Sequence, residues 1–343
     1  MYKNLQRWTR ISLIIVYLVI AAGATVRMTG SGMGCPDWPK CFGYYIPPTQ
    51  AEQLEWKPNT TYQKGNVIID NERLLIASDK FTSADSFDPS FWEPYTKHDY
   101  AIFDAKHTWI EFINRLLGAL SGLAILILFG YSLKWWRKKP IIFIFSILSL
   151  LGILFQAWLG KTVVDSNLLP LKISLHMLMA LLLIGFILVV RVASKSFGLS
   201  KLPSRKIRAL LYVTFALTLI QIVLGIQVRQ FVDVQIDRWG YDLPQFWLAA
   251  PELNFYIHRS LSILVLATSA LLYFNVVKAQ IERVFIQRIL WLIGAEVLLG
   301  IAMFYLDFPF ATQPLHLVLA TLLFGVQLYW ILRINLHRYD LSL

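Results

Sequence analysis

Residues 173–193 read ISLHMLMALLLIGFILVVRVA, and this stretch decides the fold class. It carries no charged residue before Arg191 and matches the roughly 20 apolar residues that a helix needs to cross a bilayer. We predict transmembrane helices wherever such runs recur, over residues 11–28, 109–133, 141–163, 173–193, 208–229, 254–276, 286–306 and 314–334. No signal-peptide cleavage pattern follows the first run, so it is predicted to remain as a helix. The predicted fold class is an all-α membrane protein of eight transmembrane helices.

The composition agrees with a membrane protein rather than a soluble one. Hydrophobic residues make up 57% of the 343 residues, which exceeds the usual share in soluble domains. The net charge of +11 does not indicate nucleic-acid binding, because the basic residues cluster in short loops between the apolar runs. Two cysteines are too few for a disulfide-rich fold or a zinc ribbon.

The basic residues also predict the orientation in the membrane. They precede the first run and recur in every second loop, at Lys3, Arg7, Arg10, Lys134, Arg137, Lys138, Lys139, Arg191, Lys195, Lys201, Arg205, Lys206, Arg208, Lys278, Arg283, Arg288, Arg333 and Arg338. Cytoplasmic loops are enriched in lysine and arginine, so both termini are predicted to be cytoplasmic. We expect an integral protein of the bacterial cytoplasmic membrane.

The two halves of the chain resemble each other. The aligned segments are 23–27 with 225–229, 114–117 with 258–261, 159–160 with 299–300, and 175–176 with 315–316. Four spans per copy is an even number, so both copies face the same way in the membrane. The repeat predicts two pseudo-symmetric four-helix bundles, residues 1–200 and 201–343. The first includes an extracytoplasmic loop, 29–106, with an insert near 50–98.

Three histidines lie in the first turns of even-numbered spans, near the predicted outer face: His176, His258 and His316. An ionisable residue at membrane depth is costly and indicates a function. His258 and His316 belong to one bundle, where two facing imidazoles can be the axial ligands of a haem iron. The alternative is that each histidine only forms a hydrogen bond to a neighbouring helix. That explanation would be favoured for a lone histidine, but three histidines at equivalent depths favour metal ligation.

Four arginines lie at the same predicted level as these histidines: Arg27, Arg115, Arg229 and Arg259. Arginine pairs carboxylates with two parallel hydrogen bonds, so these side chains are candidates for the haem propionates. Snorkelling to lipid headgroups explains any single one equally well.

Several motifs together resemble the haem A synthase family of integral membrane proteins. They are Gly23-Ala24-Thr25-Val26-Arg27-Met28-Thr29-Gly30-Ser31-Gly32, Cys35-Pro36-Asp37-Trp38-Pro39, Glu111-Phe112-Ile113-Asn114-Arg115, Gly160-Lys161-Thr162-Val163-Val164 with His176, and the segments around His258 and His316. The resemblance covers nearly the whole chain except the insert.

The resemblance implies an oxidoreductase that converts the C8 methyl group of haem O to the formyl group of haem A, for terminal oxidases. It implies a haem b cofactor in the C-terminal bundle, ligated by His258 and His316. It implies substrate haem O in the N-terminal bundle, with Glu111 associated with catalysis and His176 with the substrate iron. Glu111 is also spaced for an ion pair with Arg115, and both roles can hold at once.

One position departs from the family pattern. Where the family has Glu-x-x-His-Arg, this chain has Asn114 in place of the histidine, and an amide is a poor iron ligand. Either His176 alone holds the substrate iron, which would leave an open site, or another group joins it. His107 is a candidate, because it precedes Asn114 by about two helical turns.

The predicted outer loop contains two further features. Cys35 and Cys41 can close a disulfide in that compartment, and a structural staple is favoured over a redox pair. In the insert, residues 67–69 and 74–76 flank an Asp70-Asn71-Glu72 turn, which predicts a small β-hairpin. The insert weakly resembles chitin-binding-type β modules, but a cap over the outer haem face is the favoured function.

The predicted partners are haem O, haem O synthase, an electron donor and the lipid bilayer, with a homo-oligomer left open and no nucleic acid. Two alternatives compete with the enzyme: a dihaem b-type electron-transfer cytochrome, and a transporter. The spans lack proline-broken helices and paired midplane charges, which disfavours transport. Glu296 is the one buried acid that could support it.

Overall fold

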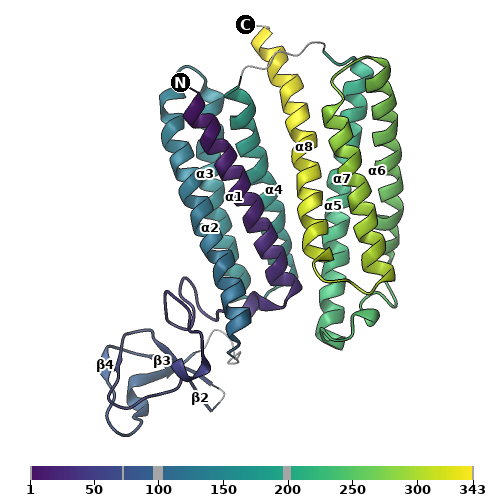
Figure 1. Cartoon of the computed structure of the whole chain (residues 1–343). Coiled ribbons are helices and arrows are strands. Elements are labelled where there is room, and N and C mark those ends of the chain that lie inside the picture. Colours follow the sequence, from purple (N-terminus) through teal and green to yellow (C-terminus); the bar gives the residue numbers. More distant parts are fainter. Residues whose placement is uncertain (1, 72, 96–102, 196–201, 342–343) are drawn as a thin grey trace. The chain divides into compact units, whose positions relative to one another are not determined.

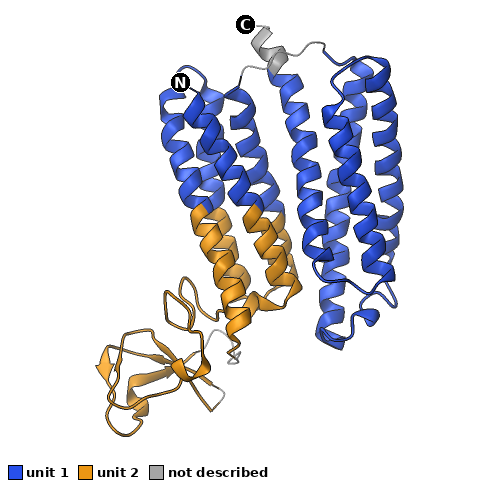
Figure 2. Cartoon of the chain, in the orientation of Figure 1, with its two compact units in different colours: residues 1–17, 121–153, 178–343 blue, residues 18–120, 154–177 orange. Residues whose placement is uncertain are grey.

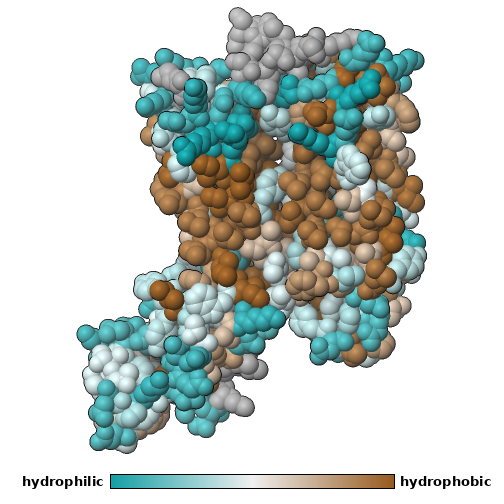
Figure 3. Space-filling model, in the orientation of Figure 1, coloured by the Kyte–Doolittle hydropathy of each residue, from teal (hydrophilic) through white to brown (hydrophobic). Residues whose placement is uncertain are grey.

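The computed structural model describes residues 2–71, 73–95, 103–195 and 202–341. Its long helices are α1 (Lys3–Met28), α2 (Ala105–Ser132), α3 (Pro140–Asp165), α4 (Pro170–Ala193), α5 (Arg205–Trp239), α6 (Leu253–Lys278), α7 (Val284–Tyr305) and α8 (Thr312–Leu341) (Figure 1). Each overlaps one predicted span, and all 8 are long and apolar enough to cross a membrane. On the face drawn in Figure 3, hydrophobic residues cover the middle of the helices and hydrophilic residues gather at their ends. The predicted fold class is confirmed.

Helix α5 continues ten residues beyond its predicted span. The side chain of Ser204 caps its start, and Gly240, at a φ of 80°, ends it with a 2.7 Å bond from its N–H to the carbonyl of Ile236. Its last turns are polar, so hydropathy does not reveal them. Val232 and Ile236 are nevertheless buried there against Trp247, and this packing stabilises the extension.

The chain divides into two compact units (Figure 2). Unit 1 comprises residues 1–17, 121–153 and 178–343, and unit 2 comprises residues 18–120 and 154–177. In unit 1, α5 packs against α6, α6 against α7, α7 against α8, and α8 against α5, so these four helices form a closed bundle. Its core contains Leu211, Leu272, Ile286 and Ile289, which are all almost fully buried.

The insert in unit 2 contains two small antiparallel sheets. The first pairs β1 (Thr61–Tyr62) with β4 (Phe81–Thr82), and the second has the order β2 (Val67–Asp70), β3 (Arg73–Ala77), β5 (Trp92–Pro94). The β2–β3 pairing sets Val67 opposite Ile76 and Ile69 opposite Leu74, so the predicted hairpin is confirmed. Glu72 of its turn, and residues 96–98 of the predicted insert, lie outside the described residues.

Short 3-10 helices complete the element order: η1 (Ser31–Met33), η2 (Ala51–Gln53), η3 (Pro89–Phe91), η4 (Leu133–Trp135) and η5 (Pro244–Phe246). The first of them, η1, follows α1 and begins the loop that contains Cys35 and Cys41. Gly30, at a φ of 68°, separates α1 from this loop in a conformation that glycine adopts without strain.

Candidate functional site

The two histidines of the C-terminal bundle face each other. His258 lies in the second turn of α6 and His316 in the second turn of α8, with ring centres 6.4 Å apart and an angle of 74° between the rings. Two nitrogen–metal bonds of about 2 Å in line, plus about 1 Å from each nitrogen to its ring centre, put axial imidazole centres roughly 6 Å apart. The observed spacing therefore fits one metal ion between the two rings.

A glycine on the neighbouring helix opposes each of these rings. A Cβ at Gly225 would lie 3.1 Å from Cε1 of His258, and one at Gly300 would lie 4.0 Å from Cε1 of His316. The side chain of Gln221 donates a 2.9 Å hydrogen bond to the carbonyl of His258. Nδ1 of His258 is buried and has no hydrogen-bond partner among the described residues. The position of the His258 ring is thus fixed by close packing, and a metal ion bound to this ring would depend on that packing.

His316 differs from His258 in having a carboxylate beside it. Its Nδ1 lies 2.6 Å from Oε2 of Glu296 on α7. The two side chains are 26% and 13% exposed, respectively. This acid, noted in the sequence for a transport alternative, is instead in contact with a candidate metal ligand.

Unit 2 contains a related arrangement. His176 lies in α4, where a Cβ at Gly160 would approach its Cε1 to 3.3 Å, and the side chain of Gln156 donates a 2.9 Å bond to its carbonyl. Nδ1 of His176 is buried without a hydrogen-bond partner in the described part of the chain. The glycine-against-ring packing therefore occurs at aligned positions of both halves.

Asn114 occupies the position that aligns with His258. A Cβ at Gly23 would lie 3.7 Å from its Oδ1, as Gly225 opposes His258. That oxygen is buried and accepts no hydrogen bond from any described residue. Residue 114 thus has the same opposing glycine as the candidate ligand His258, but its side chain is an amide.

His107 lies in the first turn of α2, beside the loop that follows α1. Its Nδ1 is 2.9 Å from the hydroxyl of Ser31, and its backbone N–H donates a 3.0 Å bond to Asp104. A Cβ at Gly34 would lie 2.5 Å from the carbonyl of His107, so the loop packs directly on this turn. His107 thus takes part in the contact between loop and helix.

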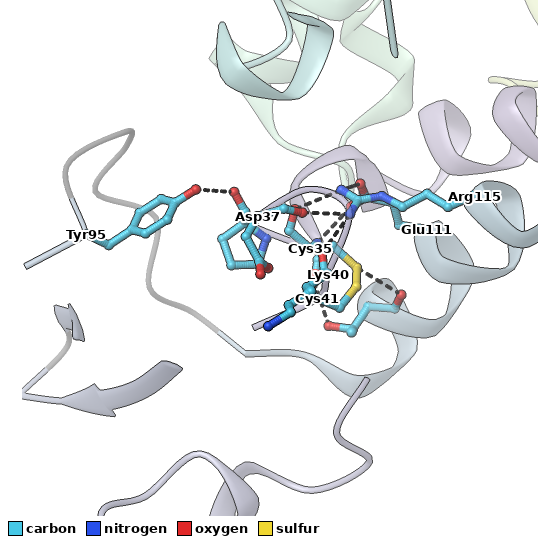
Figure 4. A network of polar contacts seen from close by, with 10 residues as sticks. Cys35, Asp37, Lys40, Cys41, Tyr95, Glu111 and Arg115 are labelled. Carbon is cyan, nitrogen blue, oxygen red and sulfur yellow. Dashed lines mark hydrogen bonds and ion pairs between the residues drawn. A yellow bond between two sulfur atoms is a disulfide. The ribbon is translucent and has the colours of Figure 1, made fainter. Parts of the chain in front are cut away.

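Glu111 and Arg115 join α2 to the same loop (Figure 4). Glu111 is only 4% exposed; its Oε2 accepts a 2.8 Å hydrogen bond from the backbone N–H of Cys35, and its Oε1 pairs with Arg115. The guanidinium of Arg115 donates to three loop carbonyls, at 3.0 Å on Cys35, 2.7 Å on Asp37 and 3.0 Å on Lys40. The predicted pair of Glu111 and Arg115 exists, and it also fixes the loop.

The loop is closed by a disulfide between Cys35 and Cys41, whose Cα atoms are 4.7 Å apart, as predicted. Within it, Asp37 accepts a 2.9 Å bond from the N–H of Gly43. Burial raises the pKa of the Asp37 carboxyl above its ordinary value, while the Gly43 N–H and the Arg115 guanidinium act in the opposite direction. The hydroxyl of Tyr95 donates a 2.6 Å bond to the carbonyl of Pro36, and burial raises the pKa of Tyr95 to about 12.

The other candidate arginines have protein contacts of their own. Arg27 donates to Sδ of Met177 at 3.3 Å, and Arg229 forms an ion pair of 2.9 Å with Asp233. Arg259 is exposed; its guanidinium lies 5.6 Å from the centre of the Phe304 ring, and it donates a 3.5 Å bond to Tyr305. A role toward haem propionates stays a prediction for all four arginines.

Sequence reasoning missed several contacts of the candidate site. Thr108 donates a 2.7 Å bond to the carbonyl of Gly34, and Tyr95 reaches the loop from the end of the insert. The contact of Glu296 with His316 was also missed, although Glu296 aligns with Gln156. The replacement of an amide by an acid at aligned positions was the sequence signal that could have indicated this contact.

Comparison with known proteins identifies relatives over nearly the whole length. The profile of the COX15-CtaA family, described as cytochrome oxidase assembly protein, matches residues 6–73 and 89–328. A protein of Wolbachia pipientis (strain wPip) named heme A synthase is 24% identical over 355 residues, covering 95% of this chain and 96% of its own. One of Bartonella tribocorum with the same name is 26% identical, covering 94% and 91%. One of Shewanella oneidensis, also so named, is 28% identical over 63% of this chain and only 54% of its own length.

Proposed function

The chain belongs to the COX15-CtaA family of cytochrome oxidase assembly proteins, and from this we propose that it is a haem A synthase, an integral membrane oxidoreductase that oxidises the C8 methyl group of haem O to a formyl group. The pair of His258 and His316 carries the proposal, because its 6.4 Å ring spacing suits one haem iron. Relatives named heme A synthase favour this reading over a dihaem cytochrome or a transporter.

The cofactor we propose is haem b, held by His258 and His316. The buried Nδ1 of His258 without a described partner and the close approach of Gly225 to its ring fit a ring positioned for a further ligand. Haem held by these two histidines would supply one-electron transfer. Gly225 and Gln221 beside His258, and Glu296 beside His316, would hold the two imidazoles in place.

The substrate we propose is haem O, bound in the N-terminal bundle with His176 at its iron. Oxidation of the methyl group to an alcohol and then to a gem-diol removes two electrons at each step, and the gem-diol loses water to give the aldehyde. With water as the oxygen source, each of the two oxidations consumes one water molecule, passes two electrons to an electron acceptor and releases two protons, whereas the loss of water releases none. Glu111, buried and already accepting one N–H from the loop, is placed to take up or pass on such a proton at its carboxylate.

Asn114 gives this proposal a feature of its own. With an amide at the position that aligns with His258, we infer that His176 is the single protein ligand of the substrate iron. One axial position then stays open, which suits oxidative chemistry on the substrate. His107 is the competing candidate, and its contact with Ser31 supports a role in holding the loop.

Orientation and partners follow from the sequence as part of the proposal. The basic loops favour cytoplasmic termini and haem sites near the outer face. On that side, the disulfide-closed loop and the insert would cover the entrance to the substrate. Haem O synthase would supply the substrate, an electron donor or acceptor would exchange electrons with haem b, and a homo-oligomer is compatible with the fold.

The decisive experiment compares cells that make haem O and lack their own haem A synthase, with and without this chain. Haems are extracted from the membranes, separated and identified by mass. We expect haem A only when the chain is present, and none with His316→Ala. If no haem A forms although the purified chain contains bound haem, the dihaem cytochrome would be the better description.

A further inference from the structure

The two bundles differ in what stands behind their aligned histidines. In the C-terminal bundle, the carboxylate of Glu296 lies 2.6 Å from Nδ1 of His316. In the N-terminal bundle, the aligned residue is Gln156, whose amide bonds the backbone carbonyl of His176 instead of its ring. A carboxyl group therefore contacts the ring of one histidine and not that of its counterpart.

Because Oε2 of Glu296 is in contact with Nδ1 of His316, Nε2 is the nitrogen of this ring that a metal can reach. An imidazole that gives its Nδ1–H to a carboxylate presents Nε2 as the free ligand atom, and the carboxylate fixes both tautomer and ring orientation. It also increases the basicity of the ligand nitrogen, which stabilises the higher oxidation state of the metal. Oε2 of Glu296 lies 2.6 Å from Nδ1 and the side chain is mostly buried, but Nδ1 makes no hydrogen bond of good geometry there, so the carboxylate acts on the ring as a charge in direct contact.

The surroundings strengthen the effect of this charge. Glu296 lies in the interior of α7, within a helix that is long and apolar enough to span a membrane. A carboxylate in such a low-dielectric place interacts strongly with any charge near it. Its other oxygen, Oε1, is buried and has no hydrogen-bond partner among the described residues. The only described polar contact of the Glu296 side chain is thus the ring of His316. The aligned residue in the other half is an amide, Gln156.

We propose that Glu296 is a positioning residue that lowers the reduction potential of the haem held by His258 and His316. This inference rests on the proposed function, since it requires that haem. A lower potential favours oxidised iron, so an electron received by this haem is passed on rather than retained. The amide at Gln156 leaves His176 without that influence, so the two halves hold iron with different electronic properties.

The test is an optical redox titration of the purified, haem-loaded chain and of Glu296→Gln, which keeps the shape and removes the charge. We expect the ratio of reduced to oxidised haem at a fixed ambient potential to rise about tenfold in the variant, which corresponds to about 59 mV for one electron. An unchanged midpoint in a variant that retains its haem would overturn the proposal.

The matched control is Glu282→Gln. Glu282 precedes α7, is 48% exposed and pairs with Arg333 at 3.2 Å, so the same change of charge there should leave the midpoint unchanged. An equal shift in both variants would assign the effect to net charge and reject the specific role of Glu296. If Glu296→Gln does not retain haem, Glu296→Asp keeps a charge at a longer distance. We expect a higher midpoint there too, and an unaltered one would reject the proposal.

Failure of the proposed function is distinguishable from failure of this inference. If the haem spectrum is unchanged by His258→Ala and His316→Ala, the haem is bound elsewhere and the proposed cofactor site is wrong. If those variants lose the haem and Glu296→Gln alone leaves the midpoint unaltered, the site stands and only the role of Glu296 is rejected.

Discussion

The backbone N–H of Cys35 donates a 2.8 Å hydrogen bond to the buried carboxylate of Glu111, which joins the loop after α1 to the second helix. The same carboxylate pairs with Arg115, and Arg115 in turn holds three carbonyls of that loop. The residue proposed to move protons is therefore also the anchor of the loop. A substitution that removes both functions at once cannot tell them apart, so the variants must be chosen to separate them.

Glu111→Gln removes the acid and keeps the contact with Cys35, although its NH2 group then replaces the oxygen that pairs with Arg115. Its amide oxygen can still accept the N–H of Cys35, but it cannot exchange a proton with the substrate. We expect haem binding to persist and formyl formation to fall about 100-fold or more, the range for loss of a general acid or base. The absorbance of the purified chain reports haem, and mass analysis of extracted haems reports product. Glu111→Ala should stop formyl formation as well, and activity near the original level in either variant would reject the catalytic role.

Gly225→Ala tests the packing around the cofactor histidine. Its new Cβ would lie 3.1 Å from Cε1 of His258, a distance that forces the ring or the helix to move. Mutation of residues that orient a metal ligand typically lowers the affinity for the metal about 10–100-fold. We therefore expect a clear loss of bound haem per chain. Gly294→Ala is the matched control on α7 of the same bundle, since nothing lies within 4 Å of its Cβ. Equal haem content in the two variants would show that the ring tolerates the shift.

Asp37→Asn tests the buried carboxyl of the loop. Burial raises the pKa of Asp37 in the folded protein above its ordinary value of 3.8. The folded state then binds more protons than the unfolded state, so this group's contribution to stability falls as pH rises from 3.8 through the folded pKa. Asparagine has no such proton to lose and can still accept the N–H of Gly43. We expect the difference in thermal midpoint between Asp37→Asn and the original chain to grow in favour of asparagine as pH rises toward neutrality, and a difference independent of pH would contradict this.

The sequence predicted those parts of the molecule that depend on local patterns. Eight apolar runs predicted eight helices, and the apolar residues 67–69 and 74–76 on either side of the Asp70-Asn71-Glu72 turn predicted the β2–β3 hairpin. The strands β1, β4 and β5 span two or three residues each, too few to show a period, and were not predicted. The end of α5 was missed because Val232 and Ile236 pack on Trp247, a contact that hydropathy cannot reveal.

The candidate site followed the same rule. The pair of Glu111 and Arg115 is one helical turn apart, so its spacing alone predicted the contact. The bond from Cys35 to Glu111 joins residues far apart in the chain, and the contact of Glu296 with His316 depends on how α7 and α8 face each other. Such contacts arise from tertiary packing. The facing of His258 and His316 was predicted because both lie in the first turns of even-numbered spans of one bundle, which places them at the same depth.

Asn114→His restores the residue type that the aligned position has in the other half. Gly23 leaves room there, since its Cβ would lie 3.7 Å from Oδ1 of Asn114, compared with 3.1 Å between Gly225 and the ring of His258. If the amide leaves one axial position of the substrate iron open, a histidine at 114 should close it, so that haem remains bound in this bundle and turnover falls. We therefore expect more haem per purified chain and less haem A in Asn114→His, and neither change in Asn114→Gln, which keeps an amide. Unaltered haem content together with unaltered haem A formation would mean that this side chain does not face the substrate iron, and His107 would become the residue to test.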